Sequence, residues 1–177
     1  TLKTLNETHA YTIVRAAGDA TSSTAAELTT INGATSLAVN ASAITALASD
    51  TASNINTLLT AGNDTAQFTS TSFGSLTGVT VSDTTADITD LTGAIAQANT
   101  ATGDTSVVFT ITAIDTINGG AMSEFTTLLG YESGNQVSIT DQNLTVDSGT
   151  ISVANARSLS ATTSGTVTGT ITSGTTI

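Results

Sequence analysis

The sequence predicts an α/β fold, a parallel solenoid of about five strand–helix repeats. An eight-residue pattern recurs along the 177-residue chain, and short segments rich in β-branched residues precede its copies. The later copies begin roughly 30 to 40 residues apart, a step that fits one strand and one helix per repeat. A doubly wound domain fits less well, because it reverses its strand order at the ligand crevice. The alternative is an all-β parallel β-helix, because Thr-rich sequences favour strands.

Each copy of the pattern has the features of a helix start. Thr24 and Glu27 have the spacing of a capping box, in which a hydroxyl accepts from a backbone N–H three residues on and an acid reaches back. Thr84 and Asp87 repeat this arrangement with a shorter acid. Large apolar residues at the fifth and eighth positions would share one helical stripe. The second and third copies are close enough to share one longer helix. The pattern occupies residues 24–31, 40–47, 51–58, 84–91, 121–128 and 152–159.

The predicted strands are short alternating segments joined by Gly and Asn. One of them lies near the start of the single repeat domain 1–177, so residues 1–20 are expected to form an N-terminal strand or arm. Another lies within residues 165–177, a C-terminal strand segment. Strand followed by helix, repeated, favours parallel strands with helical crossovers. The predicted strands are 12–14, 37–39, 79–83, 110–114, 144–146, 150–151 and 166–172.

Composition and charge exclude several classes of partner. The chain has 3 Lys and Arg against 14 Asp and Glu, and its net charge is −11. No basic patch is therefore available for nucleic acid or for an anionic membrane. Two long segments, 28–49 and 158–177, carry no charge, but their Thr, Ser, Gly and Asn residues make a lipid-facing helix costly, so membrane insertion is not expected. The absence of Cys excludes disulfides and thiolate chemistry.

The sequence offers no active site. His9 is the only histidine, and the Gly-x-Ser-x-Gly elbow of α/β-hydrolases does not occur. A β-helical polysaccharide depolymerase would need clustered carboxylates and aromatic platforms, whereas this chain has no Trp and only 3% aromatic residues. We therefore expect neither catalysis nor a cofactor.

Three acids form the candidate metal site. Asp83, Asp87 and Asp90 follow one another at spacings of four and three residues, so a helix would bring all three to one side. Hard cations such as Ca²⁺ prefer several carboxylate oxygens. The EF-hand pattern is missing, and a helix cap with a solvated acidic face explains the same residues. The glycines of Asn118-Gly119-Gly120 lack the P-loop lysine and predict a tight strand-to-helix turn.

Several segments resemble a known class of repeats. Residues 81–88 (Val-Ser-Asp-Thr-Thr-Ala-Asp-Ile), 149–156 and 166–171 carry the resemblance. They are similar to the Thr/Ala/Ser/Asp-rich tandem repeats of very large surface or secreted proteins of bacteria, especially marine cyanobacteria, and to segments of phage appendage proteins. The resemblance implies a structural, adhesive or surface-layer role with no catalytic residues.

These observations predict a structural repeat protein, a building block of an extracellular filament, surface layer or virion appendage. Its expected partners are copies of itself or neighbouring subunits, because the exposed edge of a stacked sheet is a template for association. The alternative is an adhesin-like module that binds surface glycans or calcium. The uncharged final segment is the candidate subunit contact, and its residues are Thr166, Val167, Thr168, Thr170 and Ile171.

Overall fold

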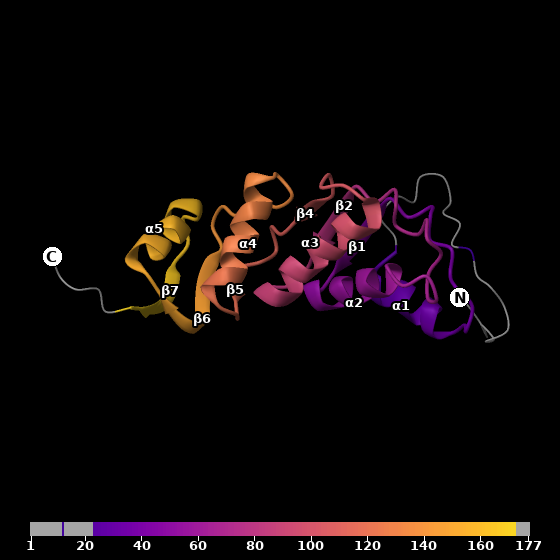
Figure 1. Cartoon of the computed structure of the whole chain (residues 1–177), viewed down its shortest axis with the longest axis horizontal. Helices are drawn as coiled ribbons and strands as arrows, with labels where there is room; N and C mark the ends of the chain where they lie inside the picture. The colour runs from indigo at the N-terminus through magenta and orange to yellow at the C-terminus, as the bar shows by residue number, and fades with distance from the viewer. Residues whose placement is uncertain (1–11, 13–22, 173–177) are drawn as a thin grey trace.

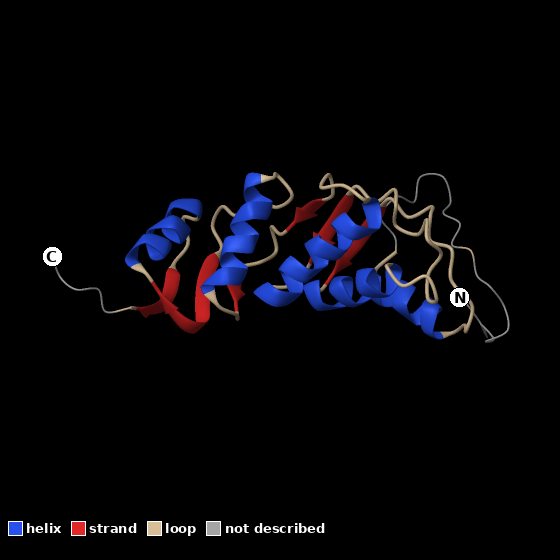
Figure 2. Cartoon of the chain, viewed as in Figure 1, coloured by secondary structure: helices blue, strands red, loops and turns tan. Residues whose placement is uncertain are grey.

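Strands and helices alternate along an elongated molecule (Figures 1 and 2). The structure is a computed structural model that describes Thr12 and residues 23–172. The helices are α1 (Ala25–Gly33), α2 (Ala52–Gly62), α3 (Ile88–Thr102), α4 (Met122–Ser133) and α5 (Val153–Thr162). The strands are β1 (Ala46–Asp50), β2 (Gly78–Val81), β3 (Thr85–Asp87), β4 (Val108–Thr110), β5 (Thr116–Asn118), β6 (Asn143–Ile151) and β7 (Val167–Ile171). The predicted α/β class is confirmed, and the all-β alternative is wrong.

All the named strands pair in parallel, in two sheets of order β1-β2-β4 and β3-β5-β6-β7. Ala46 pairs with Gly78, and Gly78 pairs in turn with Val108. Each strand therefore meets a strand from about one strand–helix unit further along the chain. Parallel neighbours need a crossover connection, which the intervening helices supply.

The helices lie side by side along the long axis of the molecule (Figure 1). Helix α1 packs against α2, α2 against α3, and α3 against α4, while α5 packs on β6 and β7. A strand–helix unit is named below by its helix and includes the strand or strands just before it. The buried core runs through successive units, and its largest side chains are Phe68, Phe73, Phe109 and Phe125.

Three predicted helix starts are confirmed by their caps. Thr24 Oγ1 accepts from the Glu27 N–H at 3.1 Å, and the Glu27 carboxylate accepts from the Thr24 N–H at 3.0 Å, which completes the capping box of α1. The hydroxyls of Thr51 and Ser152 cap α2 and α5 in the same way, each accepting from the N–H three residues on. The predicted start near residue 121 is also a helix start, since α4 begins at Met122.

Two predicted helix starts are wrong. The pattern at 40–47 forms a turn that leads into β1, so it shares no helix with α2. In the copy at 84–91, residues 85–87 form β3, and Asp87 rather than Thr84 caps the helix that follows. In both places tertiary pairing prevails over the local signal: β1 pairs with β2, and β3 pairs with β5 with Ala86 buried.

Several predicted strands overlap an observed strand, but their bounds differ from the observed ones. The segment predicted at 79–83 overlaps β2, the one at 166–172 contains β7, and the two segments predicted between 144 and 151 are one strand, β6. The strand predicted at 110–114 is misplaced, because it shares only Thr110 with β4 and the chain turns after that residue. The segment 37–39 contributes a single bridge, Val39 to Phe68. The predicted N-terminal arm 1–20 lies outside the described residues, apart from Thr12.

Substitution by Ala should change the free energy of unfolding in opposite directions at Gly165 and at Gly130. A Cβ on Gly165 would come within 2.6 Å of the Asp141 carbonyl oxygen and would also meet the Gln142 carbonyl, whereas one on Gly130 in α4 would meet nothing within 4 Å. We expect Gly165→Ala to lower the free energy of unfolding by about 1–3 kcal/mol, because backbone must move. Gly130→Ala should raise it by up to about 1 kcal/mol.

Urea unfolding monitored by circular dichroism measures both changes. Equal effects of the two substitutions would contradict the close approach of residues 141–142 to Gly165.

Candidate functional site

Carboxylates join successive units at the helix starts. Asp50, at the end of β1, accepts from the Ala26 N–H of α1 at 2.7 Å. Asp83 accepts from the Ala52 N–H of α2 at 2.6 Å. In each case an acid of one unit accepts from a first-turn N–H group of the preceding helix, where the helix dipole also favours a negative charge. These two carboxylate side chains therefore connect each unit to the preceding one.

The glycine turn before α4 takes part in the same arrangement. Gly119 donates its N–H to Asp147 Oδ2 at 2.9 Å, again from the following unit. Gly119 and Gly120 both have positive φ, and a Cβ on Gly119 would lie 2.7 Å from Asp87 Oδ2. The turn predicted from the glycines is confirmed, and it lets the backbone approach the carboxylates of two other units.

The three candidate metal ligands lie near one helix start and bind protein groups. Asp87 Oδ1 accepts from the Thr89 N–H at 2.7 Å as the N-cap of α3, and Asp90 Oδ1 accepts from the Asn56 amide of α2 at 3.4 Å. Asp83 binds α2, as described above. The three carboxylates thus turn toward different partners.

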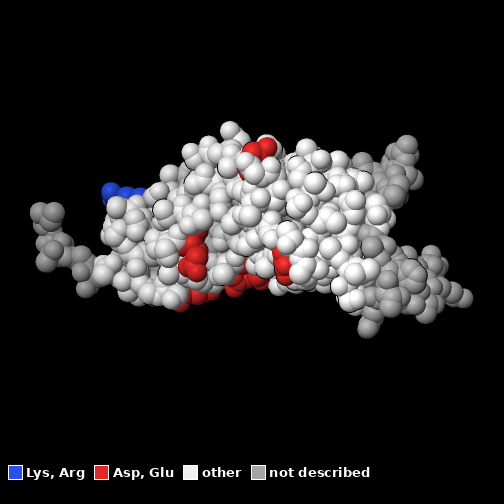
Figure 3. All heavy atoms as spheres, turned by 45° about the vertical axis from the view of Figure 1, so that its right-hand side comes forward, with Lys and Arg blue, Asp and Glu red and all other residues white. Residues whose placement is uncertain are grey.

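Acidic side chains lie mostly toward one long edge of the face shown in Figure 3. Within the described residues, no three His, Cys, Asp or Glu side chains come together as a metal site. A hollow of about 310 Å³ is lined by Asp115, Asp141 and Asn143 together with Thr112 and Ile114. Calcium binding at Asp83, Asp87 and Asp90 therefore stays a prediction.

Amide side chains form a second set of links that sequence reasoning missed. Asn63 of the α2 unit donates to Gln97 Oε1 of α3 at 2.7 Å. Asn99 and Gln136 exchange two hydrogen bonds, of 2.6 and 3.2 Å, although 37 residues separate them. Gln136 is 3% exposed, so this pair satisfies polar groups that would otherwise be costly to bury. An amide side chain recurs near the end of successive helices, and this recurrence is the sequence signal that could have predicted the links.

The predicted subunit contact lies at the end of a sheet. Strand β7 pairs with β6 and is the last strand in the order β3-β5-β6-β7. The side chains of Thr168 and Thr170 are exposed, and Ile171 is 46% exposed. Thr166 precedes the strand and donates its N–H to Asn143 Oδ1 at 2.8 Å. The candidate interface residues thus lie on and beside an edge strand.

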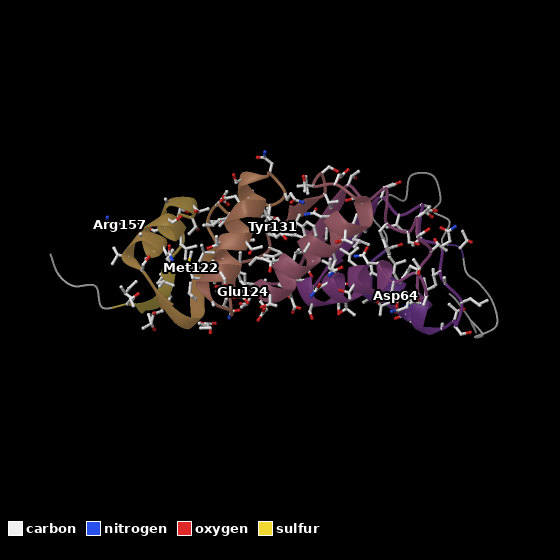
Figure 4. All side chains as sticks on the ribbon, viewed as in Figure 1. Asp64, Met122, Glu124, Tyr131 and Arg157 are labelled. Atoms are coloured by element: carbon white, nitrogen blue, oxygen red, sulfur yellow. The ribbon has the colours of Figure 1, made fainter. Side chains whose placement is uncertain are left out.

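An apolar groove runs beside this edge, between α5 and β7. Its volume is about 450 Å³, and we call it the α5 groove. Val153 at its rim is 50% exposed. Arg157 also lines the groove, and Figure 4 shows this side chain at the outer end of the molecule. The lining residues are Ile151, Val153, Ala156, Arg157, Ser160, Val167, Gly169 and Ile171.

A larger groove of about 640 Å³ follows β4, where the first sheet ends. Hydroxyl, amide and carboxylate side chains line it beside exposed Val108. Burial raises the pKa of the Glu132 carboxyl, although a hydrogen bond from the Ile139 N–H opposes this shift. We call this larger groove the β4 groove, and its lining residues are Val108, Phe109, Thr110, Ile111, Thr112, Glu132, Ser133, Asn135, Val137 and Ser138.

Comparison with known proteins assigns no family. No protein-family model matches the chain, and neither a curated protein nor a solved structure shows significant similarity to it. None of the helices in the described part is long and apolar enough to cross a membrane. The sole histidine, His9, lies outside the described residues.

Removing one inter-unit carboxylate tests its contribution to stability. We expect Asp83→Ala to lower the free energy of unfolding by about 1–2 kcal/mol, because the Ala52 N–H loses its acceptor. Asp141→Ala is the matched control, since this exposed carboxylate accepts only from neighbouring Thr140 among the hydrogen bonds of the described residues. Thermal unfolding of both variants measures the difference, and an equal loss would contradict a joining role for Asp83.

Proposed function

We propose that the chain is a parallel solenoid of about five strand–helix units that serves as a non-catalytic building block of an extracellular filament, surface layer or virion appendage. The regular pairing of each unit with the next supports the solenoid. The carboxylate and amide links recur between the same parts of successive units, as expected when one supersecondary unit is copied. A scaffold of this kind has its main contacts along the stacking axis.

The observation that carries the proposal is the end of the sheet at β7, beyond which no described strand pairs. Edge strands present unpaired backbone groups that template further pairing, and proteins usually blunt them with Lys, Pro or a covering segment. Strand β7 contains neither Lys nor Pro, and the apolar α5 groove opens beside it. An assembly contact at this end would cover both the edge of β7 and the α5 groove.

The distribution of large side chains also favours an assembly contact at the β7 end. All 4 Phe residues of the chain are buried in the earlier units, and none belongs to the α5 unit. Helix α5 buries only Leu159, whereas α2 and α3 each bury several side chains. The α5 unit therefore has a thin core of its own, and a neighbouring subunit would add to it.

Loss of the C-terminal segment should abolish assembly. We expect deletion of residues 165–177, expressed in the native cell or virus, to remove the filament, layer or appendage seen by negative-stain electron microscopy. Thr168→Lys with Thr170→Lys keeps β7 and adds charge to its exposed side chains, so it should act in the same direction. The control places the two lysines at Thr110 and Thr112, which line the β4 groove and lie outside the C-terminal segment. Normal assembly of both C-terminal variants would contradict the proposal.

A second candidate function is glycan binding in the β4 groove. Its size and its hydroxyl, amide and carboxylate lining suit a polar ligand with many hydroxyl groups. Calorimetry with a glycan panel should then detect binding that Glu132→Gln weakens about tenfold, because hydrogen bonds to a charged group are strong. Glu27→Gln is the control, far from the groove in sequence. The absence of heat from every glycan would contradict this candidate.

A further inference from the structure

The chain contains two Asn-Gly pairs, Asn32-Gly33 and Asn118-Gly119. In such a pair the backbone nitrogen of the glycine can attack the side-chain carbonyl carbon of the asparagine, because glycine has no side chain to shield its nitrogen. The attack requires an asparagine amide without competing hydrogen bonds. It also requires a glycine nitrogen that can leave its own hydrogen bond and lose its proton. The two pairs differ in both respects.

The first pair is restrained through both its side chain and its backbone. The amide group of Asn32 donates to Gln67 Oε1 at 3.0 Å. Asn32 and Gly33 are the last two residues of α1. In an α-helix each backbone N–H donates to the carbonyl four residues earlier, so attack by the Gly33 nitrogen requires loss of the last helical turn. The reaction at Asn32 must therefore disrupt a side-chain bond and a helix.

The second pair has an asparagine side chain without a hydrogen-bond partner. Asn118 is the last residue of β5 and is half-buried. Its side chain makes no hydrogen bond with any described residue. Ile117 is buried on one face of the sheet, so Asn118 lies on the other face, in register with Asp87 of β3. The amide of Asn118 thus lacks the restraint that holds the amide of Asn32.

The nitrogen that would attack Asn118 is held by a carboxylate of the following unit. Gly119 donates its N–H to Asp147 Oδ2 at 2.9 Å, and Asp147 belongs to β6, 28 residues further along the chain. Turning the Gly119 nitrogen toward Asn118 breaks this bond. The negative charges of Asp147 and of nearby Asp87 also disfavour loss of the Gly119 proton. One contact between units therefore limits the reaction at this pair.

We propose that Asn118 is a site of deamidation and isoaspartate formation, and that Asp147 of the following unit keeps the reaction slow. The Gly119 nitrogen bonds to Asn118 Cγ as the Cγ–Nδ2 bond breaks, and the Gly119 proton leaves with Nδ2 as ammonia. Water then opens the resulting succinimide ring at one of its two C–N bonds. Opening at Cγ gives aspartate, and opening at the backbone carbonyl gives isoaspartate. Water is the only co-reactant, and no redox change occurs.

Either product weakens the contact between units. A carboxylate at position 118 lies beside Asp87 in the β3–β5 pair, and like charges directly opposite each other destabilise a sheet. Isoaspartate also adds a carbon atom to the backbone at the end of β5. Because Asp147 leaves Gly119 when β6 separates from β5, the rate of deamidation depends on how often the α4 and α5 units separate.

Incubation of the intact chain at neutral pH, followed by pepsin digestion and mass spectrometry, measures the reaction at both Asn-Gly pairs. In the wild-type chain Asn118 should react faster than Asn32. Asp147→Val should speed the reaction at Asn118 about tenfold, because attack no longer breaks a charge-assisted hydrogen bond. The rate at Asn32 should not change. Valine favours strands and offers no side-chain acceptor, so it suits this exposed position in β6.

Two further variants serve as controls. Asp141→Ala removes another exposed carboxylate of the same unit, one that accepts from Thr140 and not from Gly119, and it should leave the rate at Asn118 unchanged. Asn118→Gln should suppress the conversion at this position, because the longer side chain must close a larger ring. Circular dichroism checks that the variants stay folded, and Asp147→Ser is measured beside Asp147→Val as a second substitution of the same carboxylate.

A wild-type chain in which Asn32 reacts as fast as Asn118 would overturn the inference. An unchanged rate at Asn118 in folded Asp147→Val and Asp147→Ser would overturn the role of Asp147. Equal acceleration at Asn32 and Asn118 in these variants would overturn it as well, because global unfolding would then set the rate. Acceleration confined to Asn118 supports both the site and its restraint by the following unit.

Discussion

The capture of the α1 and α2 starts by carboxylates from the following unit is the interaction on which the rest of the structure depends. The first backbone N–H groups of a helix have no partner within the helix, and burying them unpaired is costly. Asp50 and Asp83 satisfy such groups across the unit boundary, and Asp147 does the same for the turn before α4. These bonds couple the position of one helix to the strand end of the next unit.

The amide pairs act at the other end of the helices. Asn63 with Gln97, and Asn99 with Gln136, connect neighbouring units after each helix has crossed the sheet. Between the two sets of polar links lies a narrow apolar core that contains few aromatic rings. A chain with 3% aromatic residues thus gains specificity from repeated polar links and gains apolar burial from stacking. Stacking of this kind gains from a neighbour on each side of a unit, so the α5 end, on which no further described unit lies, is the place to expect a partner.

Sequence reasoning succeeded where the signal is local and failed where partners are distant. The caps at Thr24, Thr51 and Ser152 depend on an N–H three residues away, so the pattern alone located three helices. The copy at 40–47 has the same spacing of apolar residues, yet it leads into β1, because pairing with β2 fixes that backbone. The spacing of the acids after the strands predicts caps or metal ligands of their own helix. Asp83 instead caps the helix of the preceding unit, and no spacing within one repeat reveals this.

The sequence by itself determined the class of fold, the repeating order of strand and helix, the glycine turn before α4 and the location of β7. These follow from side-chain hydroxyls, β-branched residues and glycines acting on their immediate backbone. Only the tertiary structure decided which copies of the pattern become strands, which carboxylates and amides join the units, and where each described sheet ends. Those outcomes depend on groups about one repeat apart, and the free energy of pairing between them exceeds the small local preference of any single segment.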